Sequence, residues 1–411
     1  MSAASSRILF TVVVPFGVGY YVSYLFRTVN VVISGAMAED LALTAADLGL
    51  LTSIYFIIFA VFQTPLGILL DRYGPRRTQV FLLLFAILGS ILFAYSENFL
   101  VLSIARGLIG LGVSGCLMAA LKANSSWFAA DRLPLINGIT VAFGSFGALS
   151  ATVPVEWVFQ LLGWRPIFTF LAIFTMMLLF VTWLIVPEEE DVKERNLFSV
   201  REQFGELALV YRSPFFWRVS VITLVHNATF LSYQSLWMGP WLRDVGGFGP
   251  PEIAHTMLLF NLGMFIGVIC IGAIASKLQS FNIRPIFVLG VGVSASILIQ
   301  ICFVCELIQY KDRLCFFFGF FGSANLLVYS VLTQDFPKKL TGRVNTAFNM
   351  LSFVGAFIVQ WGIGLVINQW PVRVNGNYDP AGHQLAFSLL VFFEICAFVY
   401  FVWPRQNRSK G

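Results

Sequence analysis

Charge is scarce in this chain. Asp, Glu, Lys and Arg make up 11% of its 411 residues, against roughly 25% in a typical soluble domain. Hydrophobic residues reach 58%, so the sequence excludes an ordinary soluble protein. Segments of alternating polar and apolar residues are also missing, which disfavours a transmembrane β-barrel. The net charge of +5 is explained by short basic loops and gives no reason to expect a nucleic-acid partner.

Motifs for catalysis or metal binding are missing as well. The sequence has no Gly-Lys-Ser phosphate loop, no nucleophile elbow and no zinc-ligand spacing. Cys302 and Cys305 form a C-x-x-C pair without a second pair, so the six cysteines are predicted to be free thiols. We therefore expect no enzyme activity, no metal and no cofactor.

Long apolar runs are what the chain does contain. A helix needs about 20 apolar residues to cross the hydrocarbon core of a bilayer. Twelve runs reach this length, at about 9–34, 47–70, 78–96, 99–122, 134–158, 165–187, 216–242, 252–276, 285–305, 312–333, 344–368 and 384–403. The sequence therefore predicts an all-α, multi-pass integral membrane protein that has the lipid bilayer as its solvent.

The chain also repeats itself at half length. The most polar stretch, 188–215, divides six predicted helices (1–187) from six more (216–411), and we expect it to be a cytoplasmic linker. A shift of about 205 positions places Asp47 on Glu252, and a shift of 208 places Asn137 on Asn345. The pattern predicts two parallel six-helix bundles.

Basic residues predict the orientation. Most of the 26 Lys and Arg residues fall on the side of both chain ends, and few fall on the other side. Because basic loops stay in the cytoplasm, both termini are predicted to be cytoplasmic. The short loops favour a bacterial inner membrane.

A conspicuous loop joins the second and third predicted helices. It reads Gly-Ile-Leu-Leu-Asp-Arg-Tyr-Gly-Pro-Arg-Arg over residues 67–77, and the fourth helix holds Arg106 followed by small residues. Both features resemble the major facilitator superfamily of transporters. The resemblance implies a monomeric secondary transporter whose two bundles rock about a central cavity. It assigns conformational roles to Gly67, Asp71, Arg72, Gly74, Arg76, Arg77 and Arg106.

We expect Gly67 to allow close helix packing. Asp71 is expected to pair with Arg72, Arg76, Arg77 or a helix N-terminus, and to hold the bundles together on the cytoplasmic side when the cavity opens outward. Gly74 and Pro75 are expected to turn the chain.

Arg27 is the main candidate for substrate binding, because a charge inside the membrane is costly and therefore a functional candidate. Its guanidinium offers a bidentate fork to a carboxylate or phosphate. The surrounding run resembles the organophosphate and organic-anion branches of the superfamily. Residues 232–235 lack the second Arg of the phosphate exchangers, which favours a monoanion. The alternative is that Arg27 only stabilises its helix.

The remaining substrate candidates are polar or aromatic side chains within predicted helices. They are Tyr24, Asn30, Tyr55, Tyr233, Gln234, Trp237, Asn325 and Gln360. Tyr233, Gln234 and Trp237 are expected to line the cavity, whereas hydrogen bonding between helices is an equal alternative for Tyr55, Asn325 and Gln360. His226, Glu156 and Glu394 are candidates for proton coupling, because a buried carboxylate or a histidine can take up a proton during the cycle. Each could instead be a packing residue.

These observations predict a secondary transporter for a small organic anion, with proton symport or exchange for a counter-anion as the driving force. One alternative is a proton-driven multidrug efflux pump. The stretch Gly144–Ala148 lacks the adjacent proline of drug antiporters, and Pro154 comes only later, which disfavours that reading. A second alternative is a membrane sensor or assembly protein on the same fold.

Overall fold

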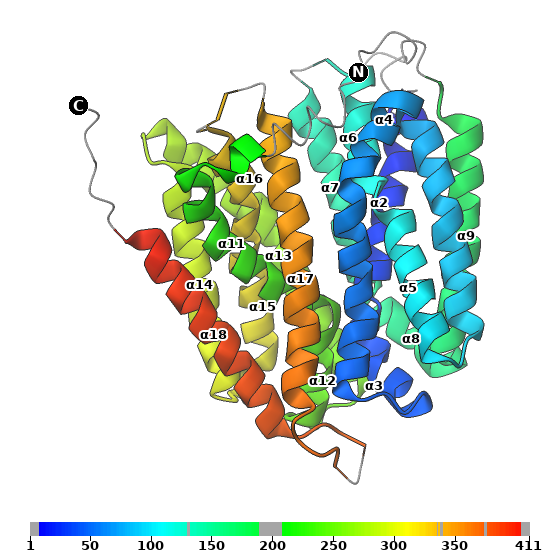
Figure 1. Cartoon of the computed structure of the whole chain (residues 1–411), viewed down its shortest axis with the longest axis vertical. Coiled ribbons are helices and arrows are strands. Elements are labelled where there is room, and N and C mark those ends of the chain that lie inside the picture. Colours follow the sequence, from blue (N-terminus) through cyan, green and yellow to red (C-terminus); the bar gives the residue numbers. More distant parts are fainter. Residues whose placement is uncertain are drawn as a thin grey trace.

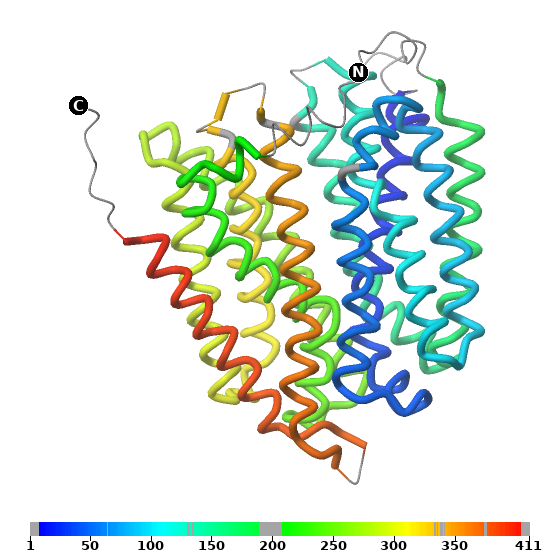
Figure 2. The backbone as a smooth tube through the Cα atoms, in the orientation of Figure 1, coloured from blue at the N-terminus to red at the C-terminus, as the bar shows by residue number. Residues whose placement is uncertain are grey.

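The computed structural model describes residues 8–129, 132–188, 208–334, 336–337, 340–373 and 376–403. Within these ranges every regular element is helical. Figures 1 and 2 show the helices of the two sequence halves as two groups lying side by side.

The first bundle contains the predicted spans one to six. Its elements are η1 (Leu9–Val13), α2 (Val14–Thr28), α3 (Asn30–Asp40), α4 (Ala45–Tyr95), α5 (Phe99–Val113), α6 (Cys116–Trp127), α7 (Leu133–Ser150), α8 (Val153–Leu162) and α9 (Trp164–Ile185). Helix α4 holds two spans, because Gly74 interrupts it with φ = 76°. This backbone conformation suits glycine, so the predicted turn at Gly74 and Pro75 is confirmed.

The second bundle contains spans seven to twelve. Its elements are α11 (Pro214–Ser232), η3 (Tyr233–Trp237), α12 (Met238–Asp244), α13 (Pro250–Ser280), α14 (Pro285–Val304), η4 (Ile308–Tyr310), α15 (Lys311–Gly322), η5 (Ser323–Leu326), α16 (Leu327–Gln334), α17 (Thr341–Ile367) and α18 (Pro380–Val402). Eleven segments of the described chain are long and apolar enough to span a membrane. The predicted seventh span corresponds to α11, η3 and α12, which contain a π-helical turn and many polar residues.

Matching helix caps support the predicted repeat. The carboxylate of Asp47 accepts a hydrogen bond from the backbone N–H of Thr44 at 3.1 Å, which caps α4. Glu252 accepts one from the N–H of Gly249 at 3.0 Å, which caps α13. These are the two acids that the sequence shift superimposes, and each satisfies a backbone donor that its helix leaves free.

The bundles pack tightly against each other at one end, which we call the closed end. There α3 lies against α12 and the beginning of α4 against the end of α17 (Figure 1). Gly239 packs on the carbonyl of Val31, and Gly364 packs on the carbonyl of Ala45. We call the other end, with the Gly74 turn, the basic end.

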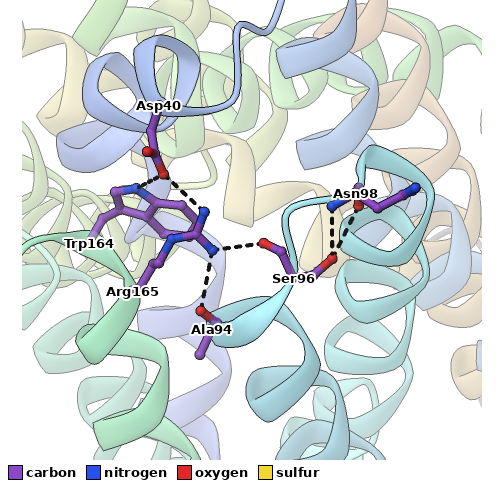
Figure 3. Close-up of polar contacts among 6 residues, drawn as sticks. All are labelled: Asp40, Ala94, Ser96, Asn98, Trp164 and Arg165. Atoms are coloured by element: carbon purple, nitrogen blue, oxygen red, sulfur yellow. Dashed lines mark hydrogen bonds and ion pairs between the residues drawn. The ribbon is translucent and has the colours of Figure 1, made fainter.

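A polar network stabilises the first bundle at its closed end (Figure 3). Arg165 on α9 forms an ion pair with Asp40 at 3.0 Å and donates to the carbonyl of Ser96 at 2.7 Å. The indole of Trp164 also donates to Asp40, at 3.3 Å. The network joins the end of α3 to α9 and to the α4–α5 loop.

Candidate functional site

A cavity of about 990 Å³ lies between the bundles. It extends to Leu121, Leu135 and Gly342, which lie near helix ends at the basic end. Its polar wall comes from both bundles and includes Tyr20, Tyr24, Arg27, Gln63, Asn137, Ser145, Asn227, Tyr329, Asn345 and Asn349. Among the described residues of this lining, Arg27 alone carries a formal charge at neutral pH.

Aromatic rings surround the guanidinium of Arg27. Its Cζ lies 4.6 Å from the ring centre of Tyr24, 5.3 Å from that of Phe353 and 5.5 Å from that of Phe59. The side chain is only 5% exposed, and its Nε has no hydrogen-bond partner among the described residues. Cation–π contacts stabilise the charge partly. They leave N–H donors of the guanidinium available for an anion.

Arg106 positions the helix that holds Arg27. Its Nη1 donates to the carbonyl of Phe26 at 3.0 Å, next to the junction between α2 and α3. The guanidinium also lies over the ring of Tyr55, 5.1 Å from its centre. Gly110 of α5 packs on the carbonyl of Tyr55, so α5 and α4 lie close together here. Arg106 thus holds the backbone carbonyl that directly precedes Arg27 in the chain.

Contacts between the bundles form one wall of the cavity. The rings of Phe59 on α4 and Phe353 on α17 lie 4.2 Å apart, centre to centre. Close by, the amide of Asn349 donates to Gln63 at 3.5 Å and accepts from the hydroxyl of Tyr329 at 3.2 Å. A ligand at Arg27 would thus touch residues of both bundles.

Only part of the predicted substrate set lines this cavity. Arg27 and Tyr24 do, and Tyr55 lies behind them with its hydroxyl donating to the carbonyl of Ser23. Asn30 lies outside the lining and is fully buried, and neither of its amide atoms has a partner among the described residues. Asn325 is also outside the lining, although its neighbour Leu326 belongs to it.

The candidates on the seventh span hold the second bundle together in this conformation. Gln234 donates to Asn261 at 2.8 Å. Trp237 donates to the carbonyl of Gln360 at 2.8 Å, and the side chain of Gln360 accepts from Ser235. Tyr233 is completely buried among aromatic rings of the same bundle. None of these residues reaches the cavity described above.

Several lining residues were not predicted from the sequence. Gln63, Asn137, Asn345 and Asn349 are the clearest cases. The repeat could have identified two of them, because the shift of 208 positions superimposes Asn137 on Asn345 and both residues line the cavity.

The loop at the basic end differs from its predicted pairing. Asp71 forms an ion pair with Lys122 of α6 at 2.6 Å rather than with a neighbouring Arg. Arg76 and Arg77 instead lie 3.5 Å and 3.0 Å from Glu188. The Gly74 turn explains the difference, because it places Asp71 and these arginines on successive spans. The pair of Asp71 stays within the first bundle, whereas Arg76 and Arg77 pair with the first residue of the predicted linker.

Two further residues of the loop can be placed. A Cβ on Gly67 would meet nothing within 4 Å, so the expected close helix packing is not found there. Arg72 lies over the ring of Tyr73, 5.4 Å from its centre. The role of the loop in an outward-open state stays a prediction.

The coupling candidates fall in two places. Glu156 is in the first turn of α8 and buried, with Oε1 unpartnered among the described residues. His226 and Glu394, which are far apart in sequence, meet inside the second bundle.

Two bundles around a central cavity, closed at one end, are the architecture of a membrane transporter rather than an enzyme. The model of the Major Facilitator Superfamily matches residues 16–360, and the chain belongs to that family. It is thus a transporter of small solutes.

Known proteins agree with this assignment. The probable sulfoacetate transporter SauU of Cupriavidus necator is 20% identical over 88% of this chain and 86% of its own. A chloramphenicol resistance protein of Streptomyces lividans is 28% identical over 87% and 89%. The inward-facing, occupied structure of a bacterial homologue of the lysosomal transporter Spinster superposes with a TM-score of 0.73, at 17% identity, covering 95% of both chains.

Proposed function

We propose that the protein is a secondary active transporter for a small organic monoanion, bound by Arg27 in the central cavity. The observation that carries the proposal is the isolation of this charge. Arg27 is nearly buried, and in the part of the lining that the structure describes there is neither an acid nor a second base. A single cation of this kind best matches one carboxylate or sulfonate group, because a second negative charge would have to be desolvated without a partner.

The packing supports a rocking motion between the bundles. In the conformation seen, the bundles meet at the closed end and the cavity reaches the basic end. With basic loops in the cytoplasm, this is the inward-facing state of a protein with both termini inside, in a bacterial inner membrane. A cavity open to the other side would require the contacts of Gly239 and Gly364 to separate. The cycle would draw on proton symport or on exchange for a counter-anion.

Efflux of amphipathic drugs is the second candidate. The relative named for chloramphenicol resistance favours it, as do the aromatic rings of Phe59 and Phe353 beside the cavity. A drug pump would not depend on the guanidinium fork of Arg27, so the two functions make different predictions for this residue.

A thermal-shift experiment separates them. The purified protein is melted with monocarboxylates, sulfoacetate, phosphorylated sugars, amino acids and cationic drugs, because a ligand that binds only the folded state raises the melting temperature. We expect stabilisation by one class of monoanion that disappears in Arg27→Ala and is strongly reduced in Arg27→Lys.

The control is the melting temperature of each variant without ligand, together with a symmetric gel-filtration peak. Stabilisation by lipophilic cations that is equal in wild type and Arg27→Ala would contradict the anion proposal and favour efflux.

A further inference from the structure

A second polar site lies inside the second bundle, away from the cavity lining. Nδ1 of His226 on α11 lies 3.2 Å from Oε2 of Glu394 on α18. The amide of Gln300 on α14 donates to the same oxygen at 2.9 Å. All three side chains are completely shielded from solvent. We call this cluster the His226–Glu394–Gln300 triad.

The triad leaves several polar atoms without partners among the described residues. They are Nε2 of His226, Oε1 of Glu394 and Oε1 of Gln300. The hydroxyl of Tyr233, which interacts electrostatically with Glu394, is unpartnered too. Buried polar groups are normally hydrogen-bonded, and orphaned ones need an explanation. A site that binds and releases a proton provides one, since its hydrogen bonds are complete only in some states of the cycle.

The surroundings of the triad are apolar. The ring of His226 lies near those of Phe230 and Phe318, and Tyr233 packs against Phe318 and Phe387. Tyr233 is a further titratable group close to Glu394. No Lys or Arg side chain of the described chain pairs with Glu394. A carboxylate alone in this setting would be very unfavourable.

A single proton bound to the triad removes this unfavourable charge. It can lie on Glu394 with a neutral His226, or on His226 with an ionised Glu394, and in both cases the triad is neutral overall. Removing the proton leaves one uncompensated negative charge, and adding another leaves one positive charge. While the triad is sealed from water, the state with one proton is therefore strongly favoured.

We infer that the His226–Glu394–Gln300 triad is the proton-carrying site of the transport cycle and that one proton crosses with each monoanion. The inference rests on the proposed function, because Arg27 neutralises the anion while the triad carries the proton. Its proton leaves only when the second bundle rearranges and water reaches Glu394. Release is thereby limited to one state of the cycle.

The seventh span connects this site to the cavity. Asn227 and Leu231, on the same helix as His226, line the cavity. The helix then passes into the π-helical turn η3, a local irregularity that often marks functional sites. A change of charge at His226 would thus act on the helix that supplies Asn227 to the substrate site.

The test compares two modes of transport in proteoliposomes, with the monoanions benzoate and methanesulfonate as the probes. Uphill uptake driven by an imposed pH gradient requires the proton, whereas counterflow exchange requires only substrate binding and rocking. Glu394→Gln keeps the size of the side chain and removes its ability to ionise. We expect it to reduce gradient-driven accumulation by at least tenfold while counterflow stays within about threefold of wild type. The matched control is Glu156→Gln, which changes a buried acid of the first bundle.

A second measurement needs no substrate. The melting temperatures of wild type and Glu394→Gln are compared from pH 5 to pH 9. The folded wild type would keep one proton on the triad, whereas the unfolded chain releases it as the pH rises, so the stability of the wild type would fall. The difference, wild type minus variant, should therefore decrease with increasing pH.

The outcomes are distinct. Loss of gradient-driven uptake in Glu156→Gln but not in Glu394→Gln would overturn the inference. Anion uptake that is driven by a sodium gradient at constant pH would overturn it as well. A melting difference that does not change with pH would also overturn it, even if neither probe is transported. Arg27-dependent anion binding alongside any of these results would leave the proposed function intact.

Discussion

Asp244 and His383 form a fully buried pair at the closed end, with Oδ2 of the acid 2.8 Å from Nε2 of the histidine. The same carboxylate accepts from Nε of Arg243 at 2.6 Å. Arg243 in turn packs against Gly35 of α3, which belongs to the other bundle. Nearby, the hydroxyl of Tyr378 donates to the carbonyl of Leu43 at 3.3 Å. A buried carboxylate therefore holds in place a cation that contacts both halves of the molecule.

Replacing Asp244 by Asn should weaken the closed end. Breaking one partner of a buried ion pair costs about 3–5 kcal/mol, because the other charge loses its compensation. We expect a clearly lower melting temperature and a larger separation between the bundles at this end. Differential scanning fluorimetry measures the first effect. His383→Gln is the milder comparison, since it leaves Asp244 and Arg243 paired. An Asp244→Asn variant as stable as wild type would show that the pair does not support this conformation.

The sequence predicted the helices well because their signal is local. Apolar runs of membrane length and the Gly74 turn depend on neighbouring residues alone, and both are found. Arg27 and Tyr24 were predicted to lie in the cavity for a related reason. A charge in an apolar run needs a polar environment, and in a transporter the cavity supplies it.

Predictions that required helical phase were less successful. Tyr233, Gln234 and Trp237 were expected to line the cavity, but none of them reaches it. All three lie in the π-helical turn η3. A π turn changes which face a side chain occupies, so a period of 3.6 residues gives the wrong direction beyond it. The partner of Asp71 was also unpredictable, because Lys122 comes 51 positions later and only the fold brings the two together.

The glycines of α17 provide a test of closure. A Cβ on Gly364 would collide with the carbonyl of Ala45, whereas one on Gly362 would meet nothing within 4 Å. Overpacking of this kind costs about 1–3 kcal/mol. We therefore expect Gly364→Ala to favour separation of the bundles at the closed end and to slow transport, with Gly362→Ala behaving like wild type.

Spin labels can report that separation. Glu39 and Gln369 are exposed residues near the closed end, one in each bundle, and can be labelled after the exposed Cys305 and Cys396 are replaced. Pulsed electron resonance should show a longer distance population in Gly364→Ala. Identical distance distributions in both glycine variants would rule out this role for Gly364.

Arg106 should affect the anion without touching it. In Arg106→Met the carbonyl of Phe26 loses its donor, and a buried polar group left unpaired costs about 1–3 kcal/mol. The displaced junction of α2 and α3 would move Arg27. We expect the Kd of the stabilising anion to rise about tenfold, measured by titration in the thermal-shift assay. Ser103→Ala is the control on the same helix, since its hydroxyl has no partner among the described residues. Unchanged affinity in Arg106→Met would limit Arg106 to stability.

The ion pair of Asp71 and Lys122 separates stability from conformational control. Both side chains are partly exposed, so the pair should contribute less than about 1 kcal/mol to stability. Asp71→Asn is therefore expected to melt within a few degrees of wild type. If Asp71 also contacts the second bundle when the cavity opens outward, the same variant should transport much more slowly. The exchange Asp71→Lys with Lys122→Asp keeps the pair but reverses it. Recovery of transport in the double variant would mean that pairing within the first bundle is the whole role of Asp71, whereas continued loss at normal stability would place its function in the outward-open state.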